Sequence, residues 1–301
     1  MRVVLAGAGG YIGRHVRREL LAAGAAVTTV GRSGPPGPDR HVVLDLAAPA
    51  DPGLTAVIDG DGTPVVVVNC AGATGTDPLQ LTAANIELPA ALVAAAARAA
   101  PPVRLVHLGS AAEYGRVERG RASRETDPAR PVGAYGMSKL AGTRIVESAR
   151  ALGLDAVVLR VTNPVGPGAP TTGLPGALAA EIRRARADGD AVRVGPLEAF
   201  RDFVDVRDVA RAVVAAASAP TLTVATVNVG SGRATVAGEL VEALVELSGY
   251  RGEVCPVGEA SSRSAAVPWQ QADVSLAAEV LGWRPRSTLR SALAALWTST
   301  A

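Results

Sequence analysis

The chain has 301 residues, of which 48% are apolar, and a formal net charge of +2. This length predicts one large domain or two smaller ones, and the balanced charge argues against nucleic acid and anionic membranes as partners. Cys70 and Cys255 lie far apart and the three histidines lack metal-ligand spacing, so we expect no disulfide framework, no metal and a cytoplasmic location. No apolar stretch approaches the ~20 residues that a membrane span needs.

The first thirty residues or so predict a dinucleotide-binding unit of strand, glycine turn, helix and strand. An apolar run at 2–6 precedes the turn, a helical pattern covers 12–23, and a second apolar run covers 26–30. The glycines follow the spacing Gly-x-x-Gly-x-x-Gly, which lets the backbone approach a pyrophosphate at the helix N-terminus. The residues of this turn that we expect to contact a dinucleotide are Gly7, Gly10, Tyr11, Ile12 and Gly13.

The end of the second strand favours NADP(H) over NAD. An NAD site places an acidic residue here, whereas this chain has Arg32, a cation for a 2′-phosphate, followed by Ser33. The alternative is a solvated arginine in a loop rich in proline and glycine. A third strand at 42–44 ends at Asp45 and Leu46, where the acid either meets the adenine amino group or caps the next segment.

A run of valines at 64–68 predicts a strand that is buried on both faces. Ligands of parallel sheets bind outside the carboxyl ends of the strands. The residues that follow this strand and are expected to border the cofactor or, further along, the substrate are Asn69, Ala71, Gly72 and Thr74. A helical pattern at 83–100 carries Asn85 in an apolar face, as a structural hydrogen-bond donor or a cofactor contact.

Ser110 follows the next apolar run, 104–108, so we expect it at the same edge of the sheet. A serine at this edge can donate a hydrogen bond to a substrate carbonyl.

Tyr135 and Lys139 form a Tyr-x-x-x-Lys pattern at the start of a helix-like segment that continues to residue 152. Residues four apart share one face of a helix, so the phenol and the ammonium can reach one cleft. A neighbouring cation lowers the pKa of a tyrosine from about 10, which lets the phenol exchange a proton near neutral pH. Lys139 is the only lysine in the chain, and arginine does not replace an ammonium at a tight site. The alternative is a surface lysine beside a half-buried tyrosine.

The glycine turn, Ser110 and the Tyr135/Lys139 pair occur in an order that resembles the extended short-chain dehydrogenase/reductases, the NAD(P)-dependent nucleotide-sugar epimerase, dehydratase and ketoreductase family. The sequence Gly-Ser-Ala-Ala-Glu-Tyr-Gly at 109–115 is similar to the family's Ser-Ser-Ala-x-Val-Tyr-Gly. The segment 160–167 is similar to its Arg-x-x-Asn-Val-Tyr-Gly-Pro. Further similar segments are 201–210, 228–232 and 281–285.

This resemblance covers essentially the whole chain and implies an α/β fold. The implied fold is a Rossmann-type doubly wound parallel sheet with a small, mostly helical substrate-binding subdomain at the C-terminal side. The expected NADP-binding domain comprises 1–163 and 204–230, and the expected substrate-binding subdomain comprises 164–203 and 231–301. Further predicted elements are helices at 208–217, 236–247, 276–281 and 289–297 and strands at 224–229 and 253–257. Segment 261–271 is either a pocket flap or a loop.

The family pattern assigns the catalytic roles to Ser110, Tyr135 and Lys139. It places Arg201 on the diphosphate of a nucleotide sugar, which suits a guanidinium fork, and the alternative is an ion pair with Asp202 or Asp205. Asn163 and the loop 164–175 would line the sugar pocket. The resemblance also implies a homodimer through the helices that flank the sheet.

Departures from the family pattern narrow the chemistry. Sugar 4,6-dehydratases place an acidic pair after the catalytic serine or threonine, whereas this chain has Ala111 and Ala112, which cannot transfer the protons of a dehydration. Glu113 stands where valine is usual, and it is either a solvated edge residue or a substrate contact. The family's 4-epimerases typically retain NAD, so Arg32 favours net reduction by NADPH.

We therefore expect an NADPH-dependent ketoreductase that acts on a nucleotide-linked 4-keto-6-deoxysugar in natural-product deoxysugar biosynthesis, with thymidine diphosphate as the expected nucleotide. The first alternative is an NAD-dependent nucleotide-sugar 4-epimerase. The second is a regulatory protein that binds NADP without turnover, and the third is a reductase of a ketone that carries no nucleotide.

Overall fold

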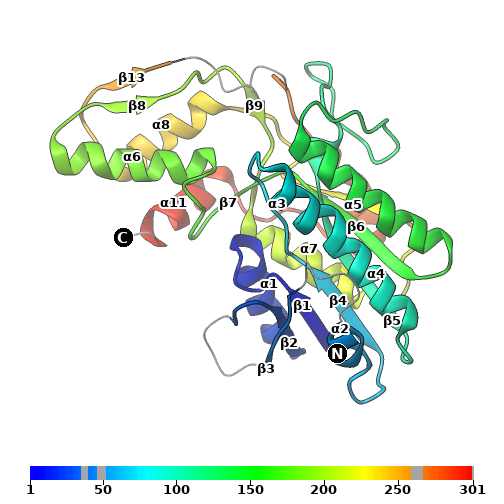
Figure 1. Ribbon diagram of the computed structural model, residues 1–301. Coiled ribbons are helices and arrows are strands. Elements are labelled where there is room, and N and C mark those ends of the chain that lie inside the picture. The colour runs from blue at the N-terminus through cyan, green and yellow to red at the C-terminus, as the bar shows by residue number, and fades with distance from the viewer. Residues whose placement is uncertain (35–39, 46–51, 259–266, 300–301) are drawn as a thin grey trace.

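The structure is a computed structural model that describes residues 1–34, 40–45, 52–258 and 267–299 (Figure 1). Leu46, which we predicted as a cofactor contact, lies outside these described residues. Of the segment 261–271, only 267–271 is described.

A seven-stranded parallel sheet forms the centre of the molecule and confirms the predicted fold class. In order across the sheet, its strands are β3 (Arg40–Val43), β2 (Ala26–Gly31), β1 (Arg2–Ala6), β4 (Val65–Asn69), β5 (Val103–Ser110), β6 (Asp155–Val161) and β11 (Thr226–Val229). The order runs in opposite directions on either side of β1 and β4. Such a reversal leaves a crevice at the carboxyl ends of the two strands, which is where ligands of this fold bind.

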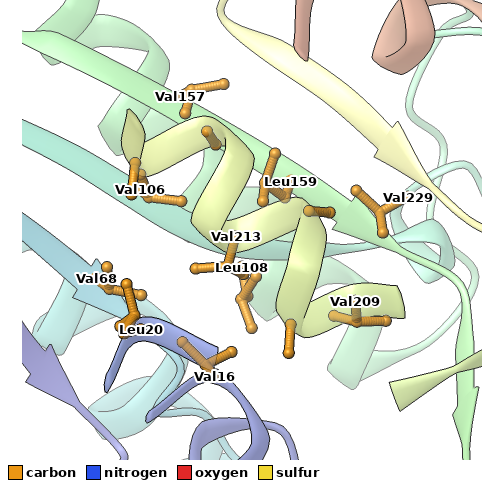
Figure 2. Close-up of a cluster of buried hydrophobic side chains, with 14 of the residues drawn as sticks. Val16, Leu20, Val68, Val106, Leu108, Val157, Leu159, Val209, Val213 and Val229 are labelled. Atoms are coloured by element: carbon orange, nitrogen blue, oxygen red, sulfur yellow. The ribbon is translucent and has the colours of Figure 1, made fainter. Parts of the chain in front are cut away.

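Helices cover both faces of the sheet. One face carries α1 (Tyr11–Ala22) and α7 (Val206–Ser218), and the other carries α2 (Pro52–Asp59), α4 (Leu88–Arg98) and α5 (Ala134–Ala151). Figure 2 shows the first interface, in which valines and leucines of α1 and α7 pack against branched side chains of β4, β5, β6 and β11. Burial of these side chains on both faces supplies most of the apolar stabilisation of the sheet.

Alternation along β1 explains why an unbroken apolar run forms this strand. Val3 and Leu5 belong to the core beneath α1 and α7, whereas Val4 and Ala6 belong to the core beneath α2, α4 and α5. Successive side chains of a strand point to opposite faces, so a central parallel strand has no face for polar residues.

A third core lies apart from the two that flank the sheet. It joins α6 (Leu174–Asp188), α8 (Ala237–Ser248) and α11 (Leu289–Ser299) to the short strands β7 (Asn163–Val165), β8 (Val192–Val194), β10 (Phe203–Asp205) and β13 (Val254–Pro256). Figure 1 shows α6, α8, β8 and β13 grouped at the upper left. Two further short strands pair with each other, β9 (Phe200–Arg201) and β12 (Thr235–Val236). The proposed boundary between two domains stays a prediction.

Two predicted segments differ in detail from the structure. The loop expected at 164–175 contains the end of β7, and the helix α6 begins at Leu174 with Pro175 in its first turn. Proline is tolerated there because the first amides of a helix have no partner within it. The helix expected at 83–100 is divided into a π-helical turn, η1 (Ala83–Glu87), and α4. A short helix, α3 (Pro78–Thr82), precedes them.

One helical run corrects our expectation about apolar length. Within the described residues, Pro78–Arg98 spans 21 residues with a mean hydropathy of 1.3, which is long and apolar enough to cross a membrane. In this structure, 39% of the most apolar 18-residue stretch of this run is buried inside the protein. Leu88 and Leu92 on α4 are at most 3% exposed and belong to the core under the sheet, so the run uses one face to cover the strands.

Candidate active site

The glycine turn after β1 is held by close backbone approaches. Gly7 has a φ of +78°, and a Cβ atom there would lie 2.5 Å from the amide nitrogen of Ala71 at the end of β4. A Cβ atom on Gly13 would overlap the carbonyl oxygen of Gly7. The amide of Gly10 donates to that same carbonyl at 3.0 Å. Glycine is therefore required at Gly7 and Gly13 because the crossing of β1, α1 and β4 leaves no room for a side chain.

The N-terminus of α1 fits the pyrophosphate of a dinucleotide. Gly10 is the N-cap, and no side chain caps the helix there. The first amides of α1 therefore remain available to an anion, which the helix dipole also favours. The Ile12 side chain packs against the core beneath α1 and α7, and the Tyr11 hydroxyl donates to the carbonyl of Gly166 at 3.5 Å. These two side chains therefore support the turn.

Three residues predicted at the adenosine end follow β2 and β3. Arg32 and Ser33 are exposed directly after β2, and Asp45 is exposed directly after β3. The amide of Leu44 donates to the carbonyl of Gly31 at 3.1 Å and brings the two strand ends together. The cation at Arg32 and the acid at Asp45 thus follow neighbouring strands at one edge of the sheet.

The Asn69 side chain has structural partners, and a contact of this residue with the cofactor stays a prediction. It is fully buried, and its Oδ1 accepts from the amide of Ala71 at 3.0 Å. Its Nδ2 lies 3.0 Å from Nδ1 of His107 on β5. The amide side chain therefore fixes the turn after β4 against the neighbouring strand, and Ala71 is half-buried beside the glycine turn.

The Asn85 side chain makes structural hydrogen bonds, as in one of its two predicted roles. Its Oδ1 accepts from the amide of Ala73 at 3.0 Å, while its Nδ2 donates to the Ala73 carbonyl and to Ser138 Oγ, both at 2.9 Å. These bonds engage both ends of the buried amide, and a contact of Asn85 with the cofactor stays a prediction. Asn85 holds the segment around Gly72 and the exposed Thr74 against α5.

Lys139 lies in the catalytic corner, by which we mean the end of β5 with Ser110 and the start of α5 with Tyr135 and Lys139. Its side chain is 5% exposed, and its Nζ donates to the carbonyl of Leu108 near the end of β5. A Cβ atom on Gly72 would lie 3.9 Å from Nζ, so the ammonium also borders the turn after β4. Burial lowers the pKa of Lys139 to about 8, while the charge of Glu113 opposes that shift.

Tyr135 is the second residue of the same helix, one turn before Lys139, and is half-buried. A Cβ atom on Gly136 would lie 2.7 Å from the carbonyl of Ala112, so this glycine lets α5 approach the turn that follows β5. The i, i+4 spacing places the phenol and the ammonium on one face. The structure thus brings Tyr135 and Lys139 to the end of β5, where Ser110 is the last residue.

Ser110 is 8% exposed and caps a single turn of 3-10 helix, η2 (Ala111–Glu113). Its Oγ accepts from the amide of Ala112 at 3.2 Å, and its own amide donates to Oε1 of Glu113 at 2.7 Å. Ala111 is buried and Ala112 is half-buried.

The structure contradicts one of the two predicted roles of Glu113, that of a solvated edge residue, and its role as a substrate contact stays a prediction. It is fully buried, and besides the Ser110 amide its Oε1 accepts from Thr143 Oγ1 at 3.0 Å. Its Oε2 pairs with Nε of Arg160 on β6 at 2.8 Å. Sequence reasoning missed Thr143, although its position four residues after Lys139 on α5 is a signal for a shared helix face.

The remaining predicted contacts lie where β6 continues into the third core. Asn163 donates from Nδ2 to the Asp202 carbonyl at 3.0 Å and to Gln270 Oε1 at 2.5 Å. Arg201 on β9 is half-buried, and its guanidinium donates to the carbonyl of Phe200 at 2.8 Å. Gln270 was missed as an individual residue, although it lies in the segment predicted as a flap or loop.

The two acids named as alternative partners of Arg201 have other contacts. The Asp205 carboxylate pairs with Arg207 at 2.5 Å. Asp202 is fully buried and accepts from the amides of Ser231 at 2.7 Å and Ala272 at 3.1 Å. Burial raises the pKa of Asp202, while these amide donors oppose the shift. Among the described residues, no group of three His, Cys, Asp or Glu side chains is arranged to hold a metal ion.

A parallel sheet with a glycine turn at its switch point and a Ser/Tyr/Lys set at the end of β5 defines an extended short-chain dehydrogenase/reductase. Residues 3–230 match the NAD dependent epimerase/dehydratase family, and the chain belongs to this family.

Known relatives extend this similarity over the full length. The chain is 42% identical over 306 residues to dTDP-6-deoxy-L-talose 4-dehydrogenase (NAD(P)(+)) of Kitasatospora kifunensis, covering 99% of this chain and 95% of the relative. Its structure is similar to MoeE5 in complex with UDP-glucose and NAD, with a TM-score of 0.86, 31% identity and coverage of 100% and 98%. It is also similar to the UDP-glucose 4-epimerase of Thermus thermophilus in complex with NAD, with a TM-score of 0.85, 25% identity and coverage of 99% and 98%.

Proposed function

We propose that this protein is an NADPH-dependent ketoreductase that acts on a thymidine-diphospho-4-keto-6-deoxysugar. The observation that carries the proposal is the 42% identity, over 99% of the chain, to an enzyme named dTDP-6-deoxy-L-talose 4-dehydrogenase (NAD(P)(+)). Oxidation at carbon 4 of a 6-deoxysugar yields a 4-keto sugar, and the reverse reaction is its reduction.

The glycine turn supports a nicotinamide dinucleotide as the cofactor. The uncapped amides of α1 and the side-chain-free surface of Gly9 and Gly10 would hold its pyrophosphate. The exposed Arg32 would hold the 2′-phosphate that distinguishes NADP from NAD. When bound, this cofactor supplies the hydride for the carbonyl carbon of the substrate.

Protein side chains provide the proton. Tyr135 donates it to the carbonyl oxygen of the substrate, and Ser110 holds that oxygen by a hydrogen bond. Lys139, one helical turn from Tyr135, favours the phenolate form and so makes the phenol a stronger acid. Replacement of the dehydratase acids by Ala111 and Ala112 removes a competing elimination.

The substrate half of the proposal rests on two residues beyond the sheet. Arg201 would bind the nucleotide diphosphate as a bidentate cation. Asn163, whose side chain contacts Gln270 of the 267–271 segment, would border the sugar.

Turnover of purified protein tests this proposal directly. With NADPH and thymidine-diphospho-4-keto-6-deoxyglucose, we expect loss of the reduced-nicotinamide absorbance and formation of the 6-deoxysugar with a hydroxyl group at carbon 4. With NADP+ and the 6-deoxysugar product, the reaction should run in the oxidative direction. Absence of cofactor oxidation with this or related 4-keto sugars would reject the substrate class.

The second candidate is an NAD-dependent nucleotide-sugar 4-epimerase. It is favoured by the similarity to the UDP-glucose 4-epimerase of Thermus thermophilus in complex with NAD. Tightly bound NAD in the purified protein, with sugar interconversion and no net cofactor consumption, would select this function. A cytoplasmic homodimer stays a prediction, and so does the absence of nucleic acid, membrane and metal partners.

A further inference from the structure

The carboxylate of Glu113 is a buried charge beside the catalytic corner, and both of its oxygens have hydrogen-bond donors. It accepts hydrogen bonds from the Ser110 amide at 2.7 Å and from Thr143 Oγ1 at 3.0 Å. Its other oxygen pairs with Arg160 at 2.8 Å, and both side chains of this pair are at most 2% exposed. The Arg160 guanidinium also stacks over the ring of Tyr114, 4.9 Å from its centroid. A buried carboxylate with this many donors has a fixed position.

Two departures from the family pattern are structurally one change. This chain has glycine at 109 where the family pattern has serine, and Glu113 where the pattern has valine. A Cβ atom on Gly109 would lie 2.8 Å from Glu113 Oε1 and 3.2 Å from Thr143 Oγ1. The missing side chain therefore makes the space that the carboxylate occupies.

The same carboxylate acts on Lys139. The ammonium donates to the carbonyl of Leu108, and Glu113 holds the amide of Ser110, two residues further along β5. Burial lowers the pKa of Lys139, and the negative charge of Glu113 is the largest influence in the opposite direction. Cys70 and His107 interact electrostatically with the same ammonium, and burial raises the pKa of the Cys70 thiol to about 12 and lowers that of the His107 ring well below its usual value.

We propose that Glu113 is a positioning residue, whose buried carboxylate fixes the backbone at Ser110 and supplies the negative charge that keeps Lys139 protonated. Without this charge, Lys139 would lose its proton more readily and would no longer acidify the phenol one turn earlier on α5. The proposal deepens the proposed function, because it assigns a residue to the same catalytic corner.

A titration that needs no substrate tests the proposal separately from the proposed function. Lys139 is the only lysine, so protein labelled with an isotope at lysine Cε, and freed of any tag, gives a single lysine resonance. In the unmodified protein this resonance should titrate at a pH of about 8. In Glu113→Gln the titration should move to lower pH by about one unit or more.

A matched control removes a carboxylate from the same helix as Lys139. Glu147 lies two turns further along α5, where it pairs with Arg144 at 2.6 Å. Glu147→Gln should leave the Lys139 titration where it is. A folded Glu113→Gln protein whose lysine titrates within about 0.3 units of the unmodified protein would overturn the proposal, since loss of a nearby charge must shift it further.

A second variant covers the risk that Glu113→Gln leaves Arg160 unpaired and does not fold. The double variant Glu113→Gln/Arg160→Met removes both charges, which buried ion pairs usually tolerate better than loss of one partner. The Lys139 titration should again move to lower pH, but by less than in Glu113→Gln, because loss of the Arg160 cation acts in the opposite direction. Circular dichroism and thermal unfolding report folding. If neither variant folds, the carboxylate is needed for the fold itself and the positioning role is rejected.

Turnover supplies a further readout once the substrate class is established. In Glu113→Gln, kcat should fall about 10-fold or more, while KM changes less than about 2-fold. As the pH rises, the remaining activity should disappear at a lower pH than in the unmodified protein, because Lys139 loses its proton earlier. A rise in KM with unchanged kcat would place Glu113 among the substrate contacts and contradict the positioning role.

Discussion

The glycine turn after β1 and the corner between β5 and α5 border one crevice, but they are built in different ways. In the turn, Gly7 and Gly13 make room for backbone groups, and the helix amides are the binding groups. In the corner, Lys139 and Glu113 are charged side chains at most 5% exposed, held by partners from β5, α5 and β6. A site made of backbone is local in sequence, whereas a site made of buried charge depends on distant partners.

The largest expected effect lies in the corner. Tyr135→Phe removes the proton donor and should lower kcat about 10²- to 10⁴-fold with little change in stability. The control Tyr250→Phe removes a hydroxyl that donates to the Asp190 carbonyl at 2.6 Å in the third core, so its turnover should stay within about 2-fold. Steady-state kinetics on both proteins measures the difference. Retained turnover in Tyr135→Phe would favour a protein that binds NADP without this chemistry.

Lys139→Met should separate stability from function in the same corner. Burial holds the pKa of Lys139 at about 8, below that of an unfolded lysine, so the charge destabilises the fold. That destabilisation is complete below pH ~8 and disappears as the pH rises past ~10. The variant should therefore gain about 1–3 kcal/mol at pH 7, less at pH ~10, and lose turnover. Denaturant unfolding at both pH values measures this, and a loss of stability at pH 7 would contradict it.

The turn should respond to size rather than to charge. Gly13→Ala places a Cβ atom onto the carbonyl of Gly7 and should lower stability by about 1–3 kcal/mol, with weaker cofactor binding. Gly9→Ala is its matched control for stability, because a Cβ atom at Gly9 meets nothing within 4 Å. Thermal unfolding compares the stability of the two variants, and a fluorescence titration with NADPH measures cofactor binding by Gly13→Ala. Equal effects at both positions would show that the close approach is not what the turn requires.

The smallest expected effect is at Arg32, which follows the strand next to β1 in the sheet. Arg32 is exposed after β2, so Arg32→Ala should weaken NADPH binding about 10-fold and NADH binding hardly at all. Arg18→Ala, on the exposed face of α1, serves as the control and should change neither affinity. The ratio of the two dissociation constants gives the result. Equal losses for both cofactors would remove the support for NADP.

Local patterns were enough to predict the frame of the molecule. The strand at 2–6, the valine strand and the Gly-x-x-Gly-x-x-Gly turn were predicted from periodicity and glycine spacing, because each depends on neighbours within a few residues. The i, i+4 spacing likewise placed Tyr135 and Lys139 on one helix. The helix α6 was not predicted, since its start lies within a segment rich in proline and glycine that is typical of a loop.

Only the tertiary structure decided the roles of the buried polar residues. The sequence places three polar residues close to the ends of strands that border the predicted crevice, as it would place ligands. The structure gives structural hydrogen-bond or ion-pair partners to the side chains of Asn69, Asn85 and Glu113. Arg160 meets Glu113 from 47 residues away, and Asn85 meets Ser138 from 53 residues away. Periodicity reports which face of an element is buried, but it carries no information on which distant donor a buried oxygen will meet.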